Sequence, residues 1–405
     1  MKLTVLGSTG SIGISTLDVV RQHEGRFEVY ALVAGRNVGV LCSQILEFRP
    51  SVVVVADEVT RSLLIDRLKG LGLQKAEWPE LGAGPAARLQ AATAEEVGFV
   101  MSAIVGVSGL EATYEAIRRG KRIGLANKEV LVASGRLVMQ AVRENGVDML
   151  PVDSEHNGAH QCFRAGRREE VTRLLLTASG GPFRHTSREA LWHVTPEQAL
   201  NHPTWKMGKR ITIDSATMMN KGFEVIEACW LFGLGPGEVE VVVHPQSSVH
   251  AMVEYNDGSV IAQVSATDMR MPIQYALTYP ERHRAPVPKL DWTHSRTWEF
   301  EPPDMEKFRL LKLAYEAQKQ GGSATCTLNA ADEIAVEAFL EGRIPFPGIA
   351  ATVEETLARQ PWREPGTIEE VIAVDREARE IARQILAESD GAHGGAHAVQ
   401  AKQPS

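Results

Sequence analysis

The sequence predicts an α/β chain with an N-terminal doubly wound parallel domain, a central α+β domain and a C-terminal helical bundle. Two observations support this fold class. Over residues 1–150, short apolar runs alternate with stretches of helical length, which is typical of a parallel sheet covered on both faces. From residue 304 to 388 the apolar pattern is helical, without a convincing strand.

The elements of the first domain follow from these runs. Near-continuous apolar segments predict parallel strands, and amphipathic segments between them predict the covering helices. Strands are expected at 2–7, 27–35, 51–57, 97–106 and 122–127, and helices at 11–23, 38–49 and 110–120.

The pattern of apolar residues changes after residue 150. Strands are expected at 171–179, 238–247 and 250–265, and a helix at 218–232. Asn256-Asp257-Gly258 lies between two alternating runs and predicts a hairpin turn, so the central domain is expected to hold a partly antiparallel sheet.

The remaining boundaries are set by composition. We place the nucleotide-binding domain at 1–150, the central catalytic domain at 151–285, a proline-rich linker at 286–303 and the helical domain at 304–388. Thr367 and Glu370 form a capping-box pattern before the last amphipathic helix. The small and polar residues 389–405 predict a disordered tail.

Composition excludes several classes of function. The 405 residues carry a net charge of −8, which gives no support to a nucleic-acid partner or an anionic membrane surface. No apolar run has the length of a membrane span, and the first residues enter a strand without a signal-peptide pattern. The four cysteines are scattered, without a C-x-x-C pair, so we expect reduced thiols and a cytoplasmic protein.

A glycine-rich turn predicts a nucleotide site. Gly7, Gly10 and Gly13 lie between the first strand and the first helix, where glycines let the backbone approach a pyrophosphate in a Rossmann-like fold. After the second strand the corner reads Gly35-Arg36-Asn37, without the acidic residue that binds a ribose diol. A guanidinium suits a 2′-phosphate, so NADP(H) is favoured over NAD(H), although a solvated surface charge would look the same.

Two acids flank Ser154 just after an apolar run. If the chain is extended there, the carboxylates of Asp153 and Glu155 point the same way and favour a cation between them. Mg²⁺ and Mn²⁺ prefer such oxygen ligands. The alternative is that the pair is solvated or caps the next helix.

A third oxygen ligand is expected downstream. Asn220 and Glu224 are four residues apart and share a face of the predicted helix, with Lys221 beside them. A carboxylate, an amide and an ammonium there could complete a metal site and hold an anion. Glu227 is a rival for the third ligand, and spacing does not decide between them.

Further segments suit anion binding. Ser179, Gly180 and Gly181 follow a strand and could hold a phosphate, or form a simple turn. The segment from His202 to Gly208 could close over a ligand with Trp205 excluding water, or Trp205 could be an ordinary packed aromatic.

The last strand of the nucleotide domain ends in polar residues. Asn127, Lys128 and Glu129 lie at its carboxyl end, the edge where doubly wound sheets bind ligands. His244 and His250 lack the spacing and companions of a zinc site and are expected to be packed. The residues therefore predict an NADP(H) oxidoreductase with a divalent-metal site that accepts a phosphorylated substrate.

A set of motifs carries a specific resemblance. GSTGSIG, ANKE, VDSEHNG, SGGPF, HPTWKMG, IDSATMMNKGFEVIEA and HPQSSVHAMV follow in order, and the chain from residue 2 to about 388 resembles the 1-deoxy-D-xylulose 5-phosphate reductoisomerase family. The resemblance implies rearrangement of 1-deoxy-D-xylulose 5-phosphate and its reduction by NADPH to 2-C-methyl-D-erythritol 4-phosphate, in non-mevalonate isoprenoid biosynthesis. It also implies a homodimer.

The resemblance also implies roles for individual residues. Asp153, Glu155 and Glu224 would bind Mg²⁺ or Mn²⁺, with Co²⁺ as a further candidate, which favours Glu224 over Glu227. The expected substrate-binding residues are Lys128, Ser154, Glu155, Ser179, His202, Ser215, Asn220, Lys221 and Glu224. The expected catalytic residues are Lys128, Ser154, Glu155, His202, Trp205 and Lys221, and Trp205 belongs to a lid loop at about 200–210. The expected cofactor-binding residues are Thr9, Gly10, Ser11, Ile12, Gly35, Arg36, Asn37, Asn127, Glu129 and Gly208.

Two other functions remain open at this stage. One is another NADP-dependent dehydrogenase, of a phosphorylated or semialdehyde substrate, which would rely on cysteine or lysine chemistry without an absolute metal requirement. The other is a sensor that binds NADP(H) without consuming it. Neither explains three acids together with a phosphate-binding cluster.

Overall fold

The computed structural model describes residues 1–205 and 207–400, with side chains described as far as Ser389 and excepting Lys206. The chain divides into two compact units, and it passes from one to the other several times. These boundaries therefore differ from the consecutive domains expected from composition. The first unit comprises Met1–Val130, Arg136–Thr172 and Ser248–Ser295, and the second comprises Leu131–Gly135, Arg173–Ser247 and the chain from Arg296 onward.

A seven-stranded parallel sheet forms the centre of the first unit. Its order is β4-β3-β2-β1-β5-β6-β7, and every neighbouring pair is parallel. The Rossmann-like α/β fold is thus confirmed. The strands are β1 (Lys2–Leu6), β2 (Glu28–Val33), β3 (Val52–Val55), β4 (Glu80–Ala83), β5 (Phe99–Ser102), β6 (Arg122–Leu125) and β7 (Met149–Pro151).

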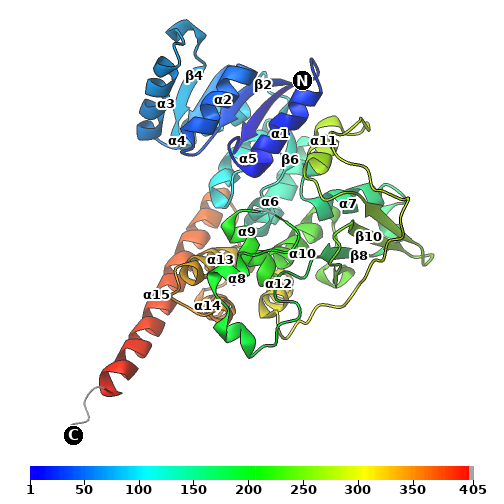
Figure 1. The fold of residues 1–405 in the computed structure, drawn as a ribbon, viewed down its shortest axis with the longest axis vertical. Helices are drawn as coiled ribbons and strands as arrows, with labels where there is room; N and C mark the ends of the chain where they lie inside the picture. Colours follow the sequence, from blue (N-terminus) through cyan, green and yellow to red (C-terminus); the bar gives the residue numbers. More distant parts are fainter. Residues whose placement is uncertain (206, 401–405) are drawn as a thin grey trace. The chain divides into compact units, whose positions relative to one another are not determined.

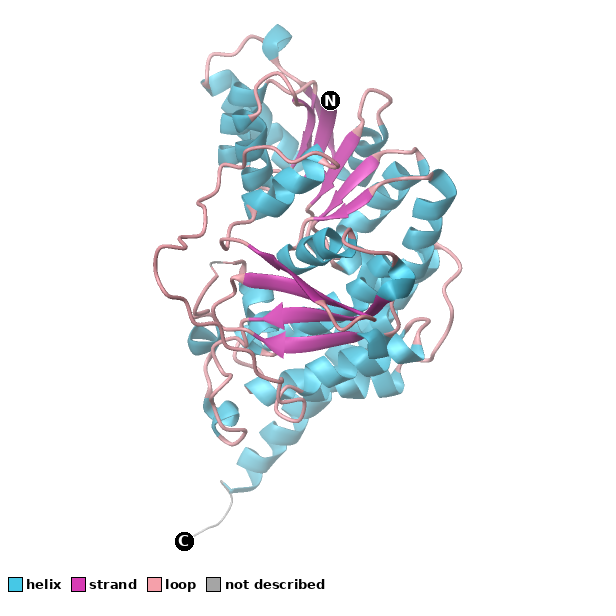
Figure 2. Cartoon of the chain, turned by 90° about the vertical axis from the view of Figure 1, so that its right-hand side faces the viewer, coloured by secondary structure: helices cyan, strands magenta, loops and turns pink. Residues whose placement is uncertain are grey.

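Helices cover both faces of this sheet, as Figure 2 shows. Right-handed crossovers that run outward from β1 in opposite directions place their helices on opposite faces, and α2 accordingly packs on α3 while α4 packs on α5 (Figure 1). The continuous apolar strands are buried from both sides, with β5 buried at every residue. These helices are α1 (Ser11–Gln22), α2 (Val38–Phe48), α3 (Glu58–Gly70), α4 (Gly84–Thr93) and α5 (Leu110–Arg118). Helix α6 (Glu129–Asn145) follows β6, and its residues Leu131–Gly135 belong to the second unit.

The strand order reverses between β1 and β5, which pair from Leu3↔Phe99 to Leu6↔Ser102. Ligands of doubly wound sheets bind at such a reversal, beyond the carboxyl ends of the strands. The loops after β1, β2 and β6 are therefore the parts of this unit best placed to hold a nucleotide.

The rest of the first unit contains a hairpin and two helices. β10 (Val249–Tyr255) and β11 (Val260–Val264) pair antiparallel around a turn in which Gly258 has φ +83°, so the predicted hairpin is confirmed. Helix α7 (Ser154–Phe163) packs on β10 and β11, and α11 (Arg270–Thr278) packs on α1.

The second unit combines two parallel strands with the helical C-terminal region. β8 (Val171–Ala178), whose first two residues belong to the first unit, pairs with β9 (Val239–Val243). Helix α13 packs on α12, α14 and α15 around a core that includes Leu328, Phe339 and Ile349, so the predicted helical bundle is confirmed. The helices are α8 (Pro196–Ala199), α9 (Lys209–Ala216), α10 (Met219–Phe232), α12 (Arg309–Gln320), α13 (Ala324–Leu340), α14 (Phe346–Arg359) and α15 (Ile368–Gln400).

The C-terminal helix extends further than the sequence suggests. Helix α15 continues to Gln400, past the expected end of order at residue 388, and residues 401–405 lie outside the described chain. At its start the Glu370 N–H donates to Thr367 Oγ1 at 3.2 Å, while the Glu370 carboxylate accepts from the Gly366 N–H instead of closing the predicted box on Thr367. No helix within the described residues is long and apolar enough to cross a membrane.

Candidate functional site

The turn after β1 is shaped by two glycines that tolerate no side chain. Gly7 has φ +88°, and a Cβ there would lie 2.4 Å from the carbonyl oxygen of Ala103 at the end of β5. A Cβ on Gly13 would lie 2.3 Å from the Gly7 oxygen, so the first turn of α1 packs directly on the loop. Thr9 lies in this loop, Gly10 is the N-cap of α1, and Ser11 and Ile12 begin the helix. Backbone N–H groups of this turn can therefore approach a pyrophosphate closely.

Gly35, Arg36 and Asn37 form the corner between β2 and α2, as expected. The Asn37 side chain accepts from the Val40 N–H at 3.3 Å and caps α2, so its polar role is partly structural. The Arg36 side chain is 82% exposed, and its Nη2 lies 3.2 Å from Asp57 Oδ2 at the start of α3. An exposed guanidinium held at this corner suits a phosphate group.

Asn127 lies at the carboxyl end of β6 and ties down the loop after β5. Its amide nitrogen donates to the Ile104 carbonyl and, at 3.0 Å, to the Gly106 carbonyl. Its Oδ1 is buried without a hydrogen-bond partner in the described chain, as is the hydroxyl of Ser8 in the glycine-rich turn. Buried polar atoms are normally satisfied, so these two atoms are candidates to bind polar groups of a cofactor. The neighbouring Glu129 begins α6 and is 7% exposed.

Asp153 and Glu155 follow β7 at the carboxyl edge of the sheet. The chain is not extended here, because α7 begins at Ser154, which corrects the premise about the two acids. An oxygen of Asp153 nevertheless lies within 4.8 Å of one of Glu155. Asp153 is the N-cap residue of α7 but makes no side-chain capping bond within the described chain, so the capping alternative is wrong. The two carboxylates are close enough to contribute oxygen ligands to one cation.

Polar contacts fix this acidic pair. Lys128 Nζ lies 2.9 Å from Asp153 Oδ2, with side chains 11% and 22% exposed. Ser154 Oγ donates to Glu155 Oε2 at 2.5 Å. Among the described residues of this unit, Lys128, Asp153, Ser154 and Glu155 are therefore brought together as expected.

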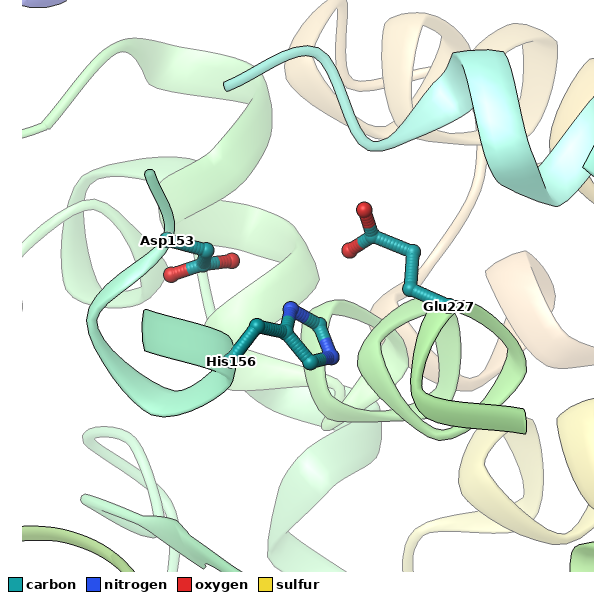
Figure 3. A group of neighbouring side chains, drawn as sticks. All are labelled: Asp153, His156 and Glu227. Atoms are coloured by element: carbon teal, nitrogen blue, oxygen red, sulfur yellow. The ribbon is translucent and has the colours of Figure 1, made fainter. Parts of the chain in front are cut away.

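His156 is a candidate that the sequence reasoning missed. It lies in the first turn of α7, is 1% exposed, and has a ring nitrogen within 4.8 Å of a carboxylate oxygen of Asp153 (Figure 3). Its position three residues after Asp153, on the same side of a helix start, is the signal that could have identified it.

Helix α10 carries the second acidic group. Glu224 is fully buried and accepts from Asn220 Nδ2 at 2.6 Å and from Lys221 Nζ at 2.5 Å, while Lys221 is 4% exposed. The predicted shared face of Asn220, Lys221 and Glu224 is therefore confirmed. Glu227 projects from the same helix, as Figure 3 shows, and is 3% exposed.

A second cluster in the same unit surrounds His202. Its Nε2 lies 3.1 Å from Ser179 Oγ, just after β8, and 3.1 Å from Ser215 Oγ on α9. Its Nδ1 accepts from the backbone N–H groups of Thr204 and Trp205 at 3.1 and 2.9 Å. Nδ1 therefore has no proton and Nε2–H is the donor in the neutral ring. Burial lowers the pKa of His202, which favours this neutral form.

The backbone around this cluster is also suited to an anion. Gly180 and Gly181 have φ of +82° and +65°, and a Cβ on Gly181 would lie 2.7 Å from the Ser215 carbonyl oxygen. Both glycines follow Ser179, so the hydroxyl and the left-handed backbone form one concave turn. The phosphate-binding interpretation of this segment gains support over the simple turn.

The described residues of the predicted lid segment, 200–205 and 207–208, form no helix or strand between α8 and α9. Trp205 is half-buried, Gly208 is the exposed N-cap of α9, and Lys206 lies outside the described residues. Helix α9 begins at Lys209, so the irregular segment ends slightly before the expected residue 210.

The two histidines set aside earlier remain outside any candidate metal group found among the described residues. The His244 ring stacks on Phe300 with centroids 4.7 Å apart, and its Nδ1 lies 2.9 Å from the Glu299 carbonyl oxygen. The four cysteines are free and buried, and burial raises the pKa of the Cys162 thiol to about 12. A reactive thiolate is therefore not available from this position.

Comparison with known proteins places the chain in a family. Residues 3–135 match the model described as 1-deoxy-D-xylulose 5-phosphate reductoisomerase, residues 149–232 match its C-terminal domain model, and residues 264–381 match the DXP reductoisomerase C-terminal domain. The chain is 66% identical over 383 residues to the 1-deoxy-D-xylulose 5-phosphate reductoisomerase of Solibacter usitatus, covering 95% of this chain and 96% of that protein. The chain belongs to the 1-deoxy-D-xylulose 5-phosphate reductoisomerase family.

Solved structures of reductoisomerases share the whole fold. The enzyme from Zymomonas mobilis in complex with NADPH is 46% identical, with a TM-score of 0.88, and the match covers 95% of this chain and 98% of that one. A DOX-P reductoisomerase in complex with NADPH, fosmidomycin and magnesium is 40% identical, with a TM-score of 0.90, and the match covers 96% and 98% of the two chains. The resemblance seen in the motifs is therefore confirmed along nearly the full length.

Proposed function

We propose that this chain converts 1-deoxy-D-xylulose 5-phosphate into 2-C-methyl-D-erythritol 4-phosphate, using NADPH and a divalent metal ion. The observation that carries this function is the 66% identity to a reductoisomerase across 95% of the chain. A related reductoisomerase was solved with NADPH and magnesium, and the polar groups of this chain fit both. The reaction belongs to the non-mevalonate route to isoprenoids.

The residues fit NADPH as cofactor. The glycine turn at Gly7 and Gly13 leaves room for a pyrophosphate, and the exposed Arg36 suits a 2′-phosphate. The buried Oδ1 of Asn127 is an acceptor that a cofactor amide could satisfy. The proposed cofactor-binding residues are Thr9, Gly10, Ser11, Ile12, Gly35, Arg36, Asn37, Asn127, Glu129 and Gly208.

The proposed metal ligands are Asp153, Glu155 and Glu224. Together they give an all-oxygen, acidic donor set, which is what Mg²⁺ and Mn²⁺ prefer. His156 and Glu227 are buried alternatives that would form a mixed set with Asp153, and an imidazole is a poorer ligand for Mg²⁺. When bound, a divalent ion polarises the ketone oxygen and stabilises negative charge on it.

The proposed phosphate pocket consists of Ser179, His202, Ser215, Asn220 and Lys221. Neutral His202 presents an N–H between two serine hydroxyls, so it can donate to a phosphate oxygen without being protonated. Lys221 adds positive charge from α10. Binding a phosphate away from the reacting carbons fixes the substrate for the chemical steps.

The remaining residues orient and shield the reacting carbons. Ser154 holds the Glu155 carboxylate through its hydroxyl, and Lys128 places an ammonium beside Asp153. We propose that both contact the carbonyl and hydroxyl region of the substrate, and that Trp205 in the lid segment excludes water. NADPH, when bound, supplies the hydride for the reduction.

We also propose that the enzyme acts as a cytoplasmic homodimer. The hairpin strand β11 exposes Val260 and Ile261, at 48% and 38%, and it pairs with β10 along only one edge among the described residues. An exposed apolar edge strand is a surface that natural proteins usually cover, and a second copy of the chain is the occupant that we propose.

One assay tests the function against its alternatives. Purified protein, NADPH and 1-deoxy-D-xylulose 5-phosphate are mixed with Mg²⁺ or with a chelator, and NADPH absorbance is followed. We expect oxidation with Mg²⁺ and none with the chelator. Metal-independent oxidation of a semialdehyde instead would favour the other dehydrogenase, and NADPH binding without oxidation of either substrate would favour a sensor.

A further inference from the structure

A buried carboxyl group on α13 lies outside the proposed site. Asp332 is fully buried, and neither of its carboxylate oxygens has a hydrogen-bond partner within the described part of the chain. An ionised carboxylate in such a position carries the full cost of desolvation without compensating hydrogen bonds. The group therefore requires a neighbour that stabilises it or a proton that removes its charge.

The nearest cation, Arg210, stabilises the Asp332 carboxylate only weakly. Arg210 Nη2 lies 3.7 Å from Asp332 Oδ2, too long for a hydrogen bond, and donates instead to Asn329 Oδ1 at 3.0 Å. The same guanidinium also lies 3.8 Å from Asp214 and 3.4 Å from Glu333. One positive charge is thus divided among three acids, and at 3.7 Å it compensates the Asp332 carboxylate only weakly.

The next cation is engaged by other acids. Arg379 on α15 binds Glu333 at 2.5 Å and Asp375 at 2.7 Å. Within the described part of the second unit, the charged groups that face this cluster include Arg210 and Asp214 from α9, Glu333 from α13, and Asp375 and Arg379 from α15. The Arg210 guanidinium lies 3.8 Å from Asp214 Oδ2 and 3.7 Å from Asp332 Oδ2, so both carboxyl groups face the same cation. Burial, followed by the Asp214 charge, raises the pKa of Asp332 well above its usual value.

We propose that Asp332 and Asp214 share one proton in a carboxylic acid–carboxylate hydrogen bond, and that this bond positions α9 for binding the substrate phosphate. Two carboxyl groups in hydrogen-bonding reach cannot both be ionised cheaply, and a single shared proton converts their repulsion into a bond. Asp332 is thereby a positioning residue on α13 for a helix that carries part of the site.

The geometry of α9 explains why its position matters. Asp214 directly precedes Ser215, whose hydroxyl lies 3.1 Å from His202 Nε2. The Ser215 carbonyl also packs so closely on Gly181 that a Cβ there would approach it to 2.7 Å. A shift of α9 would therefore move both the hydroxyl and the glycine turn of the phosphate pocket. This part of the inference rests on the proposed function.

The shared proton predicts how the stability of the folded chain should depend on pH. Because the pKa of Asp332 is raised in the folded state, its contribution to stability is complete below the unfolded value of about 3.8 and is lost as pH rises toward the folded pKa. The side-chain amide of Asp332→Asn is uncharged at every pH, so this variant does not lose that stability as pH rises. We expect the Tm of Asp332→Asn minus that of the wild type to grow between pH 5 and pH 9.

The control is Glu337→Gln, which removes an exposed carboxylate from the same helix. Its Tm difference from the wild type is expected to stay constant over this pH range. A difference for Asp332→Asn that is equally constant would overturn the shared proton, whatever the absolute stability of the variant.

Kinetics test the positioning role. Asp332→Leu replaces the carboxyl group with a branched apolar side chain that cannot share a proton, and we expect KM for the phosphorylated substrate to rise roughly tenfold, with kcat and the Kd for NADPH within about twofold. Asp332→Asn, which can still donate to Asp214, is expected to keep the wild-type KM. An unchanged KM in Asp332→Leu would overturn the positioning role. If the wild type itself does not oxidise NADPH with this substrate, the proposed function and the positioning role fail together, while the Tm comparison still decides the shared proton.

Discussion

Replacing Glu224 with Gln separates the structural role of this residue from its proposed role as a metal ligand. Glu224 is fully buried, and Lys221, which is 4% exposed, donates to it at 2.5 Å. Breaking a buried ion pair costs roughly 3–5 kcal/mol. The Gln carbonyl can still accept one hydrogen bond, so we expect a loss of unfolding free energy at the low end of this range, about 3 kcal/mol. For a unit of this size that lowers Tm by roughly 6–12 °C.

The effect on catalysis should be far larger than the effect on stability. Loss of a ligand that holds a divalent ion removes several kcal/mol of charge stabilisation, so we expect kcat to fall at least roughly 10²-fold at saturating Mg²⁺. NADPH binding, measured by fluorescence titration, should persist because the glycine-rich turn after β1 and the Arg36 corner belong to the other unit.

Two variants serve as controls for this prediction. Glu227→Gln changes the same residue type on the same helix and should retain turnover with Mg²⁺, because Glu227 is not a proposed ligand. Lys221→Met combined with Glu224→Gln removes both buried charges and should recover stability without recovering activity. Wild-type turnover of Glu224→Gln at saturating Mg²⁺ would refute the ligand assignment.

Three further predictions concern the cofactor and phosphate sites. Gly13→Ala should lower both stability and NADPH affinity, because its Cβ would lie 2.3 Å from a backbone atom. In the control Gly39→Ala, the Cβ would meet only a side-chain oxygen at 3.8 Å, so this variant should stabilise α2 by about 0.5–1 kcal/mol. Normal NADPH binding by Gly13→Ala would contradict the tight turn. Arg36→Gln should raise KM for NADPH roughly tenfold and leave KM for NADH nearly unchanged; equal changes for both cofactors would exclude a contact with the 2′-phosphate. Burial lowers the pKa of His202. The contribution of His202 to stability should therefore be present above about pH 6.5 and decline as pH falls through the folded pKa. A Tm difference between the wild type and His202→Asn that does not change between pH 5 and pH 8 would refute the neutral ring.

The sequence was most informative where patterns are long. The strands from β1 to β3, and β5 and β6, were predicted because their apolar runs are continuous and separated by helices. β4 and β7 have only four and three residues and include Gly82 and Pro151, so they carry no readable pattern. Helices α3, α4 and α6 were also missed. Most residues of α3 are exposed, and α4 is rich in alanine, so neither shows a clear amphipathic pattern.

The candidate site was predicted mainly where spacing along one element fixes geometry. Asn220 and Glu224 lie four apart on α10 and contact each other as expected. The pair around Ser154 was predicted from the wrong premise of an extended chain. Spacing could not reveal the tautomer of His202 or the burial of Asp332, because both depend on groups that are distant in sequence and meet only after folding.

The ligand assignment can be tested most directly by locating the ion. Crystals grown with Mn²⁺ and NADPH would give an anomalous difference map in which the metal is seen independently of the protein. We expect one strong peak, coordinated by carboxylate oxygens of Asp153, Glu155 and Glu224 at roughly 2.1 Å. A peak bound by His156 and Glu227, or no peak at these acids in an active enzyme, would contradict the account.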